Sequence, residues 1–171
     1  IRHPWESGLD NSPAWDEPLK QIRVHKETLP AYERKDLGHG VPADQRPRDE
    51  HYDRYVYLVN LFRRLGYREE EIRKECPFLI KDVLFSAVLY IGEHLVLVIS
   101  VSLKQDESEV EEWVEATSRA IAGSLWCPEC KQFESFDVVG GRLIHSATAA
   151  GFLPLFGSAA SREQAQSLFE I

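Results

Sequence analysis

Apolar side chains recur every three or four residues through the central part of the chain, and this spacing predicts helices. The clearest helix is Arg48–Leu65. Acidic residues begin it, Arg63 and Arg64 end it, and Gly66 follows as a C-terminal stop signal. Its apolar stripe consists of Tyr52, Tyr55, Val56, Val59 and Phe62.

Further helices follow from the same spacing and from start and stop signals. Ser108 and Glu111 match a capping box at the start of one of them. In chain order these helices are Arg68–Glu75, Ile80–Leu103, Ser108–Leu125 and Ser161–Ile171, with a short helix also expected within Asp16–Glu27.

The segment Ile80–Leu103 is apolar at almost every position. Its length would suit a membrane span, but Glu93 and His94 lie in its middle, and ionisable groups are costly in lipid. We therefore expect a buried helix of an all-α protein and no membrane as partner. Leu95–Ile99 would also suit a strand, and the length of the whole segment favours a helix.

The other segments lack helical periodicity. Residues 1–49 are polar, aromatic and rich in Pro, and long loops of this kind are usually functional. Phe133–Ile144 predicts a short β-hairpin with Gly140 and Gly141 at its turn. Thr148–Phe156 is expected to be an apolar loop. The pattern predicts an all-α fold with elaborated loops and one short β-hairpin.

Composition limits the partners and the compartment. The net charge is −8, from 20 basic and 28 acidic residues, which argues against nucleic acid and anionic membranes as partners. Three cysteines, Cys76, Cys127 and Cys130, are too few for a disulfide scaffold and indicate a reduced, cytoplasmic setting. The chain lacks Met and its last predicted helix has no stop signal, so we expect a piece of a longer protein.

The segment His3–Asp16 places one carboxylate, Asp10, in a turn-forming frame between Trp5 and Trp15. Aromatic faces suit stacking against sugar rings, and an apolar wall favours the protonated form of a carboxyl group. A protonated carboxyl group beside aromatic platforms is what a glycosidase uses as its general acid. A well-packed surface loop would show the same composition.

A second cluster of charged and aromatic residues, Arg46–Tyr55, stands at the start of the central predicted helix. Arg46 could form paired hydrogen bonds with a carboxylate or with two hydroxyls. Tyr52 would lie over the same helix end. The alternative interpretation is a helix start held by ion pairs.

Motifs for metals, cofactors and nucleophiles are weak or missing in the sequence. Cys127 and Cys130 form a lone CxxC, for which Cys76 and His145 are the only loose partners. A turn after a helix explains this motif as well, so no metal and no cofactor are predicted. The sequence contains no HExxH, no GxSxG elbow and no phosphate-binding glycine loop.

Several segments together resemble glycoside hydrolase family 63 and its bacterial relatives, most closely the MGH1-like mannosylglycerate and glucosylglycerate hydrolases. His3–Asp16 resembles HPWESGxDNSPxWD, and Arg46–Tyr55 resembles RPTDxxYxRY. Pro77–Leu89 is similar to PFxVxDxxFNxxL, Leu125–Asp137 to LWDxxxGxFxxxD, and Gly151–Phe156 to the loop before the next helix. These motifs occur in order over nearly the whole chain.

The resemblance implies a partial (α/α)6 barrel, or six-hairpin toroid, and an inverting α-glycosidase whose two carboxyl groups stand ~6.5–9.5 Å apart. Asp10 takes the position of the family's general acid. Trp5 matches a tryptophan that lines the sugar subsite. Arg46 and Tyr52 match a pair that contacts the glycerate end of the substrate.

The resemblance also implies that residues 1–171 are a single partial catalytic domain whose start and end are missing. The family's general base, a glutamate near the end of the barrel, would lie beyond Ile171. Two positions depart from the family's pattern: Ser86 stands where Asn is frequent, and Cys127 stands where Asp is usual. Neither of these positions is catalytic.

We therefore expect the complete protein to hydrolyse a small α-glucoside or α-mannoside, such as glucosylglycerate or mannosylglycerate, without a cofactor. The fragment alone is expected to be inactive. An oligosaccharide or debranching-type α-glucosidase and a non-catalytic carbohydrate-binding remnant of the same fold are the alternatives. The partner in each case is a small-molecule carbohydrate, and the sequence indicates no oligomeric state.

Overall fold

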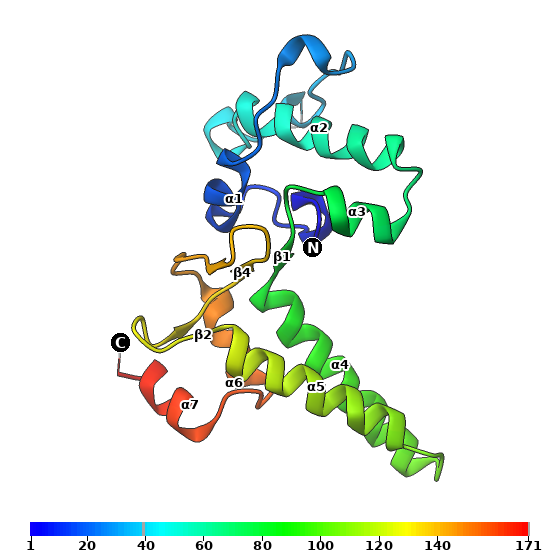
Figure 1. Ribbon diagram of the computed structural model, residues 1–171. Helices are drawn as coiled ribbons and strands as arrows, with labels where there is room; N and C mark the ends of the chain where they lie inside the picture. The colour runs from blue at the N-terminus through cyan, green and yellow to red at the C-terminus, as the bar shows by residue number, and fades with distance from the viewer. Residues whose placement is uncertain (39, 171) are drawn as a thin grey trace. The chain divides into compact units, whose positions relative to one another are not determined.

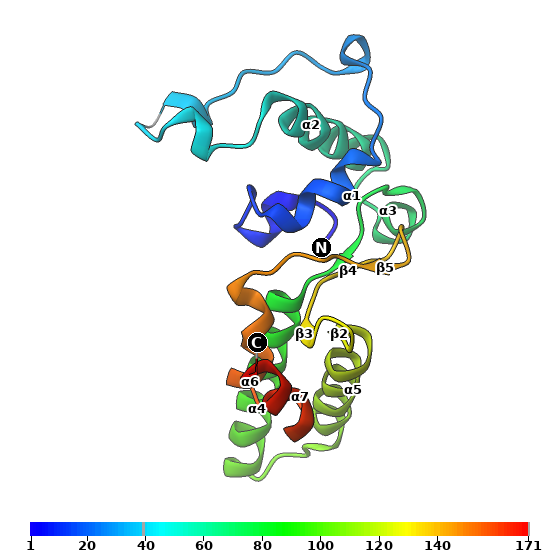
Figure 2. The same ribbon diagram turned by 90° about the vertical axis from the view of Figure 1, so that its left-hand side faces the viewer.

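A computed structural model of the chain describes residues 1–38 and 40–170 (Figures 1 and 2). The fold is mostly helical, with a few short strands, as the hydrophobic pattern predicts. The chain forms two compact units. The first consists of residues 1–80 and 137–140, and the rest of the chain forms the second.

The first unit is built around one long helix, α2, which the sequence predicts to within a residue at each end. Tyr55 and Leu58 lie on its buried face. The positive φ of Gly66 (61°) lets the chain leave the helix. The elements of this unit are η1 (Pro4–Ser7), η2 (Pro13–Trp15), α1 (Asp16–Lys20), η3 (Lys26–Thr28), η4 (Asp36–Gly38), η5 (Ala43–Gln45), α2 (Asp49–Arg64) and α3 (Glu69–Glu75), where η denotes a 3₁₀ helix.

The second unit contains two helices, α4 and α5, that pack side by side (Figure 1). Its core joins these helices to β3 and α7, through residues that include Val83, Tyr90, Val114, Ile121 and Phe133. Its elements are α4 (Val83–Ser102), α5 (Ser108–Ser124), β2 (Trp126–Cys127), β3 (Gln132–Phe133), β5 (Arg142–Leu143), η6 (Ala149–Phe152), α6 (Leu153–Phe156) and α7 (Arg162–Leu168).

Two short strands lie where the chain passes between the units, β1 (Ile80–Lys81) and β4 (Phe136–Asp137). A three-stranded sheet has the order β1-β4-β5, and β2 pairs with β3 in a separate antiparallel hairpin. The predicted hairpin with Gly140 and Gly141 at its turn is therefore confirmed. The β2–β3 hairpin was not predicted, because its strands are only two residues long and hold no alternating pattern.

Helix α4 is confirmed as a helix, but the expectation that it is buried is wrong for the described chain. Its N-cap is Asp82, whose carboxylate accepts the backbone N–H of Phe85 (2.9 Å). Beyond the first turns its side chains are largely exposed, including Val88, Leu95 and Val98. Its neighbours in the second unit cover only one side of it, which leaves a broad apolar face open.

By length and composition, α4 is the one helix of the described residues that could cross a membrane, and 17% of its most apolar window is buried. A core helix passes the same test. The expectation of no membrane therefore stays a prediction.

Several local predictions are corrected by the structure. Ser108 does not form a capping box, because its hydroxyl donates a hydrogen bond to Asp106 (2.7 Å) and Glu107 is the N-cap. The loop expected over Thr148–Phe156 contains η6 and α6, with Pro154 near the start of α6, where a missing N–H costs nothing. The short helix expected within Asp16–Glu27 ends at Lys20.

Helix α7 starts as predicted, with a capping box between Ser161 and Gln164. It ends at Leu168, and Ile171, the last residue of the predicted helix, lies outside the described residues.

Candidate functional site

The first unit contains all four residues that the sequence singled out: Trp5, Asp10, Arg46 and Tyr52. The rings of Trp5 and Tyr52 meet edge to face, with centroids 5.8 Å apart. Burial raises the pKa of Tyr52, and the negative charges of Asp36 and Asp10 raise it further. Trp5, Asp10 and Tyr52 therefore belong to one cluster.

The Asp10 backbone is held by two aromatic side chains. Gly8 ends η1 in the left-handed conformation (φ 67°), which turns the chain toward Asp10. The indole N–H of Trp15 donates to the carbonyl oxygen of Leu9 (2.7 Å), and the hydroxyl of Tyr55 donates to that of Asp10 (2.6 Å). Two consecutive carbonyl groups are thus fixed, while the half-buried Asp10 carboxylate forms no hydrogen bond with any described residue.

The two tryptophans that flank Asp10 differ in role. Trp15 is 2% exposed and packs edge-on against Phe78, so it shapes the loop and offers no open face. Trp5 is 42% exposed, and its ring contacts the rings of His3 and Tyr55. Trp15 therefore fits the alternative interpretation of a well-packed surface loop. Trp5 retains the exposed aromatic face that stacking against a sugar ring needs.

His3 fixes the start of the segment. Its Nδ1 accepts the backbone N–H of Trp5 (3.0 Å), and its Nε2 lies 3.0 Å from the carbonyl oxygen of Tyr55. This pair of contacts suits a neutral ring protonated at Nε2. Burial lowers the pKa of His3 below its ordinary value of 6.5.

The stability of the chain is expected to decrease as the pH falls below about 6.5, because unfolded His3 then binds a proton that buried His3 does not. Burial lowers the pKa of His51 as well, with the same sign of effect. Urea denaturation between pH 7 and pH 5 measures the slope. His3→Asn keeps an acceptor for the Trp5 N–H and loses the titration, so its slope should be shallower. Equal slopes in both proteins would refute this role of His3.

Tyr55→Phe removes the hydroxyl that holds the Asp10 carbonyl and is expected to lower the free energy of unfolding by about 1 kcal/mol. The Asp10 loop then keeps only one of its two anchors, the hydrogen bond from Trp15 to the Leu9 carbonyl oxygen. Tyr57→Phe on the same helix is the control, because the Tyr57 hydroxyl forms no hydrogen bond within the described residues. Equal effects of the two substitutions would show that the anchor does not matter.

Arg46 carries a buried polar atom without a partner. Its Nε is inaccessible to solvent and forms no hydrogen bond with the described residues. Asp36 lies near enough for Arg46 to contribute to the lowered pKa of Asp36, whose main cause is the hydrogen bond from Arg34. Ion pairs do hold the start of α2, as the alternative interpretation predicts, for example between Arg34 and Asp49 (2.7 Å). Arg46 forms no such pair within the described residues.

Arg34 and Tyr32 complete the cluster, and sequence reasoning did not find them. The guanidinium carbon of Arg34 lies 4.6 Å from the ring centre of Tyr52, and Tyr32 stacks on Tyr52 with centroids 5.6 Å apart. Arg34 pairs with Asp36 (2.6 Å) and Asp49 (2.7 Å). Both residues come from the loop before α2, which has no periodicity that could indicate where its side chains point.

No group of three or more potential metal ligands lies at this cluster among the described residues. The arrangement consists of one half-buried carboxylate on an anchored loop, an open tryptophan face, and a guanidinium with unused hydrogen-bonding capacity. These groups can protonate a leaving oxygen, stack on a sugar ring and bind an anion.

A family model described as "Mannosylglycerate hydrolase MGH1-like glycoside hydrolase domain" matches residues 1–170. The chain is 44% identical over 168 residues to mannosylglycerate hydrolase of Thermus thermophilus, covering 98% of this chain and 40% of that protein. It is 29% identical over 173 residues to glucosylglycerate hydrolase of Mycolicibacterium hassiacum, covering 38% of that protein.

The fold is similar to a crystal structure of the family 63 mannosylglycerate hydrolase of Thermus thermophilus in complex with Tris and D-glycerate. The TM-score is 0.90 at 45% identity, over 99% of this chain and 40% of that one. The chain thus spans about 40% of the length of the relatives it matches.

Proposed function

Because the chain belongs to the MGH1-like glycoside hydrolase domain family, we propose that it forms part of a hydrolase that cleaves a small α-mannoside or α-glucoside of glycerate. Asp10 is the general acid, Trp5 lines the sugar subsite, and Arg46 with Tyr52 receives the glycerate. The fold of the complete protein is an (α/α)6 barrel, and the described helices are a part of that ring.

The observation that carries this proposal is the buried, unpartnered Nε of Arg46 in the same unit as the anchored Asp10 loop. A buried guanidinium N–H without a partner is costly, and a carboxylate bound after a rotation of the Arg46 side chain would satisfy it with a charge-assisted hydrogen bond. The carboxylate of glycerate has this chemistry. A neutral oligosaccharide offers only hydroxyl groups to the same donor.

In the proposed reaction, protonated Asp10 donates its proton to the glycosidic oxygen as the bond to the sugar's anomeric carbon breaks. A water molecule attacks that carbon from the opposite face and loses its proton to a general base, so the configuration is inverted. We place the base in the part of the protein outside residues 1–171. This chain then holds one half of the catalytic pair.

The debranching-type α-glucosidase remains the second candidate, favoured by the exposed Trp5, since a wide aromatic platform suits longer sugars. A comparison of three substrates with the full-length protein distinguishes the two. We expect the highest kcat/KM with an α-glycosylglycerate, a much lower value with the matching α-glycosylglycerol, which lacks the carboxylate, and the lowest with a neutral α-linked oligosaccharide. A preference for the oligosaccharide would refute the glycerate assignment.

Residues 1–171 expressed alone should show no turnover of an α-glycosylglycerate, because the proposed base is outside them. The open apolar face of α4 should also make this chain self-associate. Measurable hydrolysis by the isolated chain would contradict the proposed division of the catalytic pair.

A further inference from the structure

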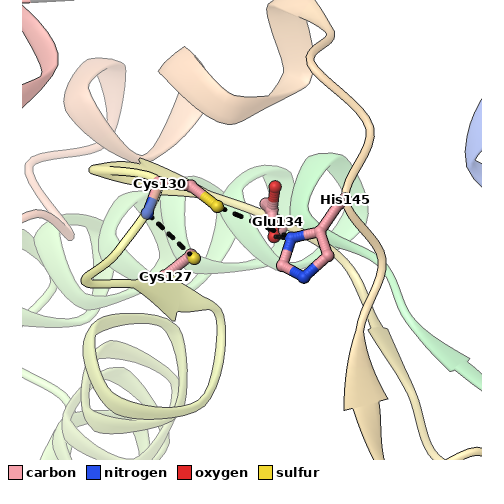
Figure 3. A group of neighbouring side chains, drawn as sticks. All are labelled: Cys127, Cys130, Glu134 and His145. Atoms are coloured by element: carbon pink, nitrogen blue, oxygen red, sulfur yellow. Dashed lines mark hydrogen bonds and ion pairs between the residues drawn. The ribbon is translucent and has the colours of Figure 1, made fainter.

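Four side chains of the second unit form a group that the proposed hydrolysis does not use: Cys127, Cys130, Glu134 and His145 (Figure 3). One potential ligand atom from each lies within 4.8 Å of the others. The two cysteines come from the β2–β3 hairpin, Glu134 follows β3, and His145 follows β5. The fold therefore gathers two sulfurs, one imidazole nitrogen and one carboxylate oxygen.

The hairpin turn itself holds the two sulfurs together. Cys127 pairs with Gln132 in the hairpin, and the backbone N–H of Cys130 donates to the Cys127 sulfur (3.2 Å). Lys131 has a positive φ (54°), which reverses the chain directly after Cys130. Both cysteines are free; Cys127 is buried and Cys130 is exposed, so the group can be reached from solvent.

Glu134 is the most deeply buried member of the group. Its side chain is fully enclosed, and its Oε1 accepts a hydrogen bond from Gln132 (2.6 Å). Its Oε2 lies 2.8 Å from the His145 Nδ1, which in turn lies 3.6 Å from the Cys130 sulfur. Gln132 thus occupies one carboxylate oxygen and leaves the other directed at the group.

We propose that Cys127, Cys130, Glu134 and His145 bind one Zn²⁺ ion at a structural site. Zinc takes sulfur, nitrogen and oxygen ligands in a tetrahedron, with bonds of about 2.3 Å to sulfur and about 2.0–2.2 Å to nitrogen and oxygen. Atoms that already lie within 4.8 Å of one another reach this geometry by small side-chain rotations. Four protein ligands close the coordination sphere, which is typical of structural and not of catalytic zinc.

Two other uses of the group are disfavoured by its surroundings. A redox-active CxxC needs only its two thiols, whereas here Glu134 and His145 add a carboxylate oxygen and an imidazole nitrogen within 4.8 Å of the two sulfurs. An ion pair between Glu134 and His145 would not need the two sulfurs beside it. The cluster as a whole has the composition of a metal site.

A zinc ion at this group would replace the sequence-based expectation of no metal. Of the two loose partners considered for the CxxC, His145 belongs to the group and Cys76 does not, since Cys76 is buried and its thiol contacts the carbonyl oxygen of Phe78. Cys127 also stands where the family's pattern has Asp. The four side chains lie in the second unit, whereas Asp10 and Arg46 lie in the first, so the zinc proposal does not depend on the proposed hydrolysis.

The test uses the protein purified with Zn²⁺ or Co²⁺ and then freed of loosely held metal. We expect one Zn²⁺ per chain by elemental analysis, and with Co²⁺ an intense sulfur-to-cobalt charge-transfer band that shows thiolate ligation. Cys130→Ser should weaken that band and lower the affinity for zinc, because one of the two thiolate ligands is lost and Cys127 remains. His145→Gln should weaken zinc binding by at least about 10–100-fold, the loss that follows removal of a supporting group. Circular dichroism checks that each variant is folded.

His25→Gln and Cys76→Ser are the matched controls, because neither residue belongs to the group. Both should keep one Zn²⁺ and the charge-transfer band. Absence of bound metal in the folded protein, metal content unchanged in Cys130→Ser and His145→Gln, or a Cys127–Cys130 disulfide that forms in the presence of zinc would each overturn the proposal.

Discussion

Replacing Asp10 by Asn in the full-length protein is expected to lower kcat for an α-glycosylglycerate by about 10²–10⁴-fold. Asn has nearly the same shape but cannot donate a proton to the leaving oxygen. The backbone anchors of this position, from Tyr55 to the Asp10 carbonyl and from Trp15 to the Leu9 carbonyl, do not depend on the side chain. The fold and KM should therefore change little. Steady-state kinetics measures kcat and KM, and a thermal melt checks the fold.

Substrates with different leaving groups show whether Asp10 acts as a general acid or only stabilises the structure. A substrate whose leaving group is a good one, such as a nitrophenyl glycoside or a glycosyl fluoride, needs little protonation. Asp10→Asn should therefore retain far more of its activity on such a substrate than on the glycerate glycoside. Asp44→Asn, which alters an exposed carboxylate of η5, is the control and should behave as the wild type. Equal losses on both substrates would remove Asp10 from the acid role.

Replacing Arg46 by Ala in the full-length protein should lower kcat/KM for the α-glycosylglycerate by about 10- to 150-fold. This range corresponds to about 1.5–3 kcal/mol for one hydrogen bond to a charged group. The loss should appear mainly in KM, because the glycerate carboxylate is bound in the ground state and in the transition state alike. The α-glycosylglycerol without a carboxylate should lose little.

Arg48→Ala is the matched control for Arg46→Ala, since Arg48 is an exposed arginine that pairs with Glu50 (3.2 Å). It should leave the kinetics unchanged. Arg46→Lys should recover part of the loss, because an ammonium group retains the charge without the planar pair of donors. If Arg46→Ala affects the neutral glycoside as strongly as the glycerate glycoside, the anion-binding role of Arg46 is wrong.

The long helices could be predicted because their signals are local. The apolar stripe of α2, its acidic first turn and Gly66 lie within one segment, and its observed bounds differ from the predicted ones by one residue. Burial was harder to predict. The apolar sequence of α4 predicts a covered helix, but most of its apolar face is open in the described chain.

Residues of the candidate site could be proposed from the sequence only where neighbouring positions form a recognisable motif. Asp10, Trp5, Arg46 and Tyr52 come from two such motifs. Side chains that join the cluster from outside these motifs, such as Tyr32 and Arg34 on their loop, give no periodic signal.

The candidate zinc ligands show the same limit. Glu134 and His145 are separated in sequence by the β4–β5 hairpin, and only the fold brings His145 Nδ1 to 2.8 Å from Glu134. The CxxC motif alone therefore does not identify the other two ligands of such a site.

The central claim is that Asp10 is the acid of an inverting hydrolase acting on an α-glycosylglycerate. Proton NMR of the full-length protein, recorded during cleavage of α-mannosylglycerate or α-glucosylglycerate, tests it most directly. We expect the β-anomer of the free sugar to appear first with the wild type, and hardly any cleavage with Asp10→Asn. First appearance of the α-anomer, or cleavage by Asp10→Asn at the wild-type rate, would contradict the claim.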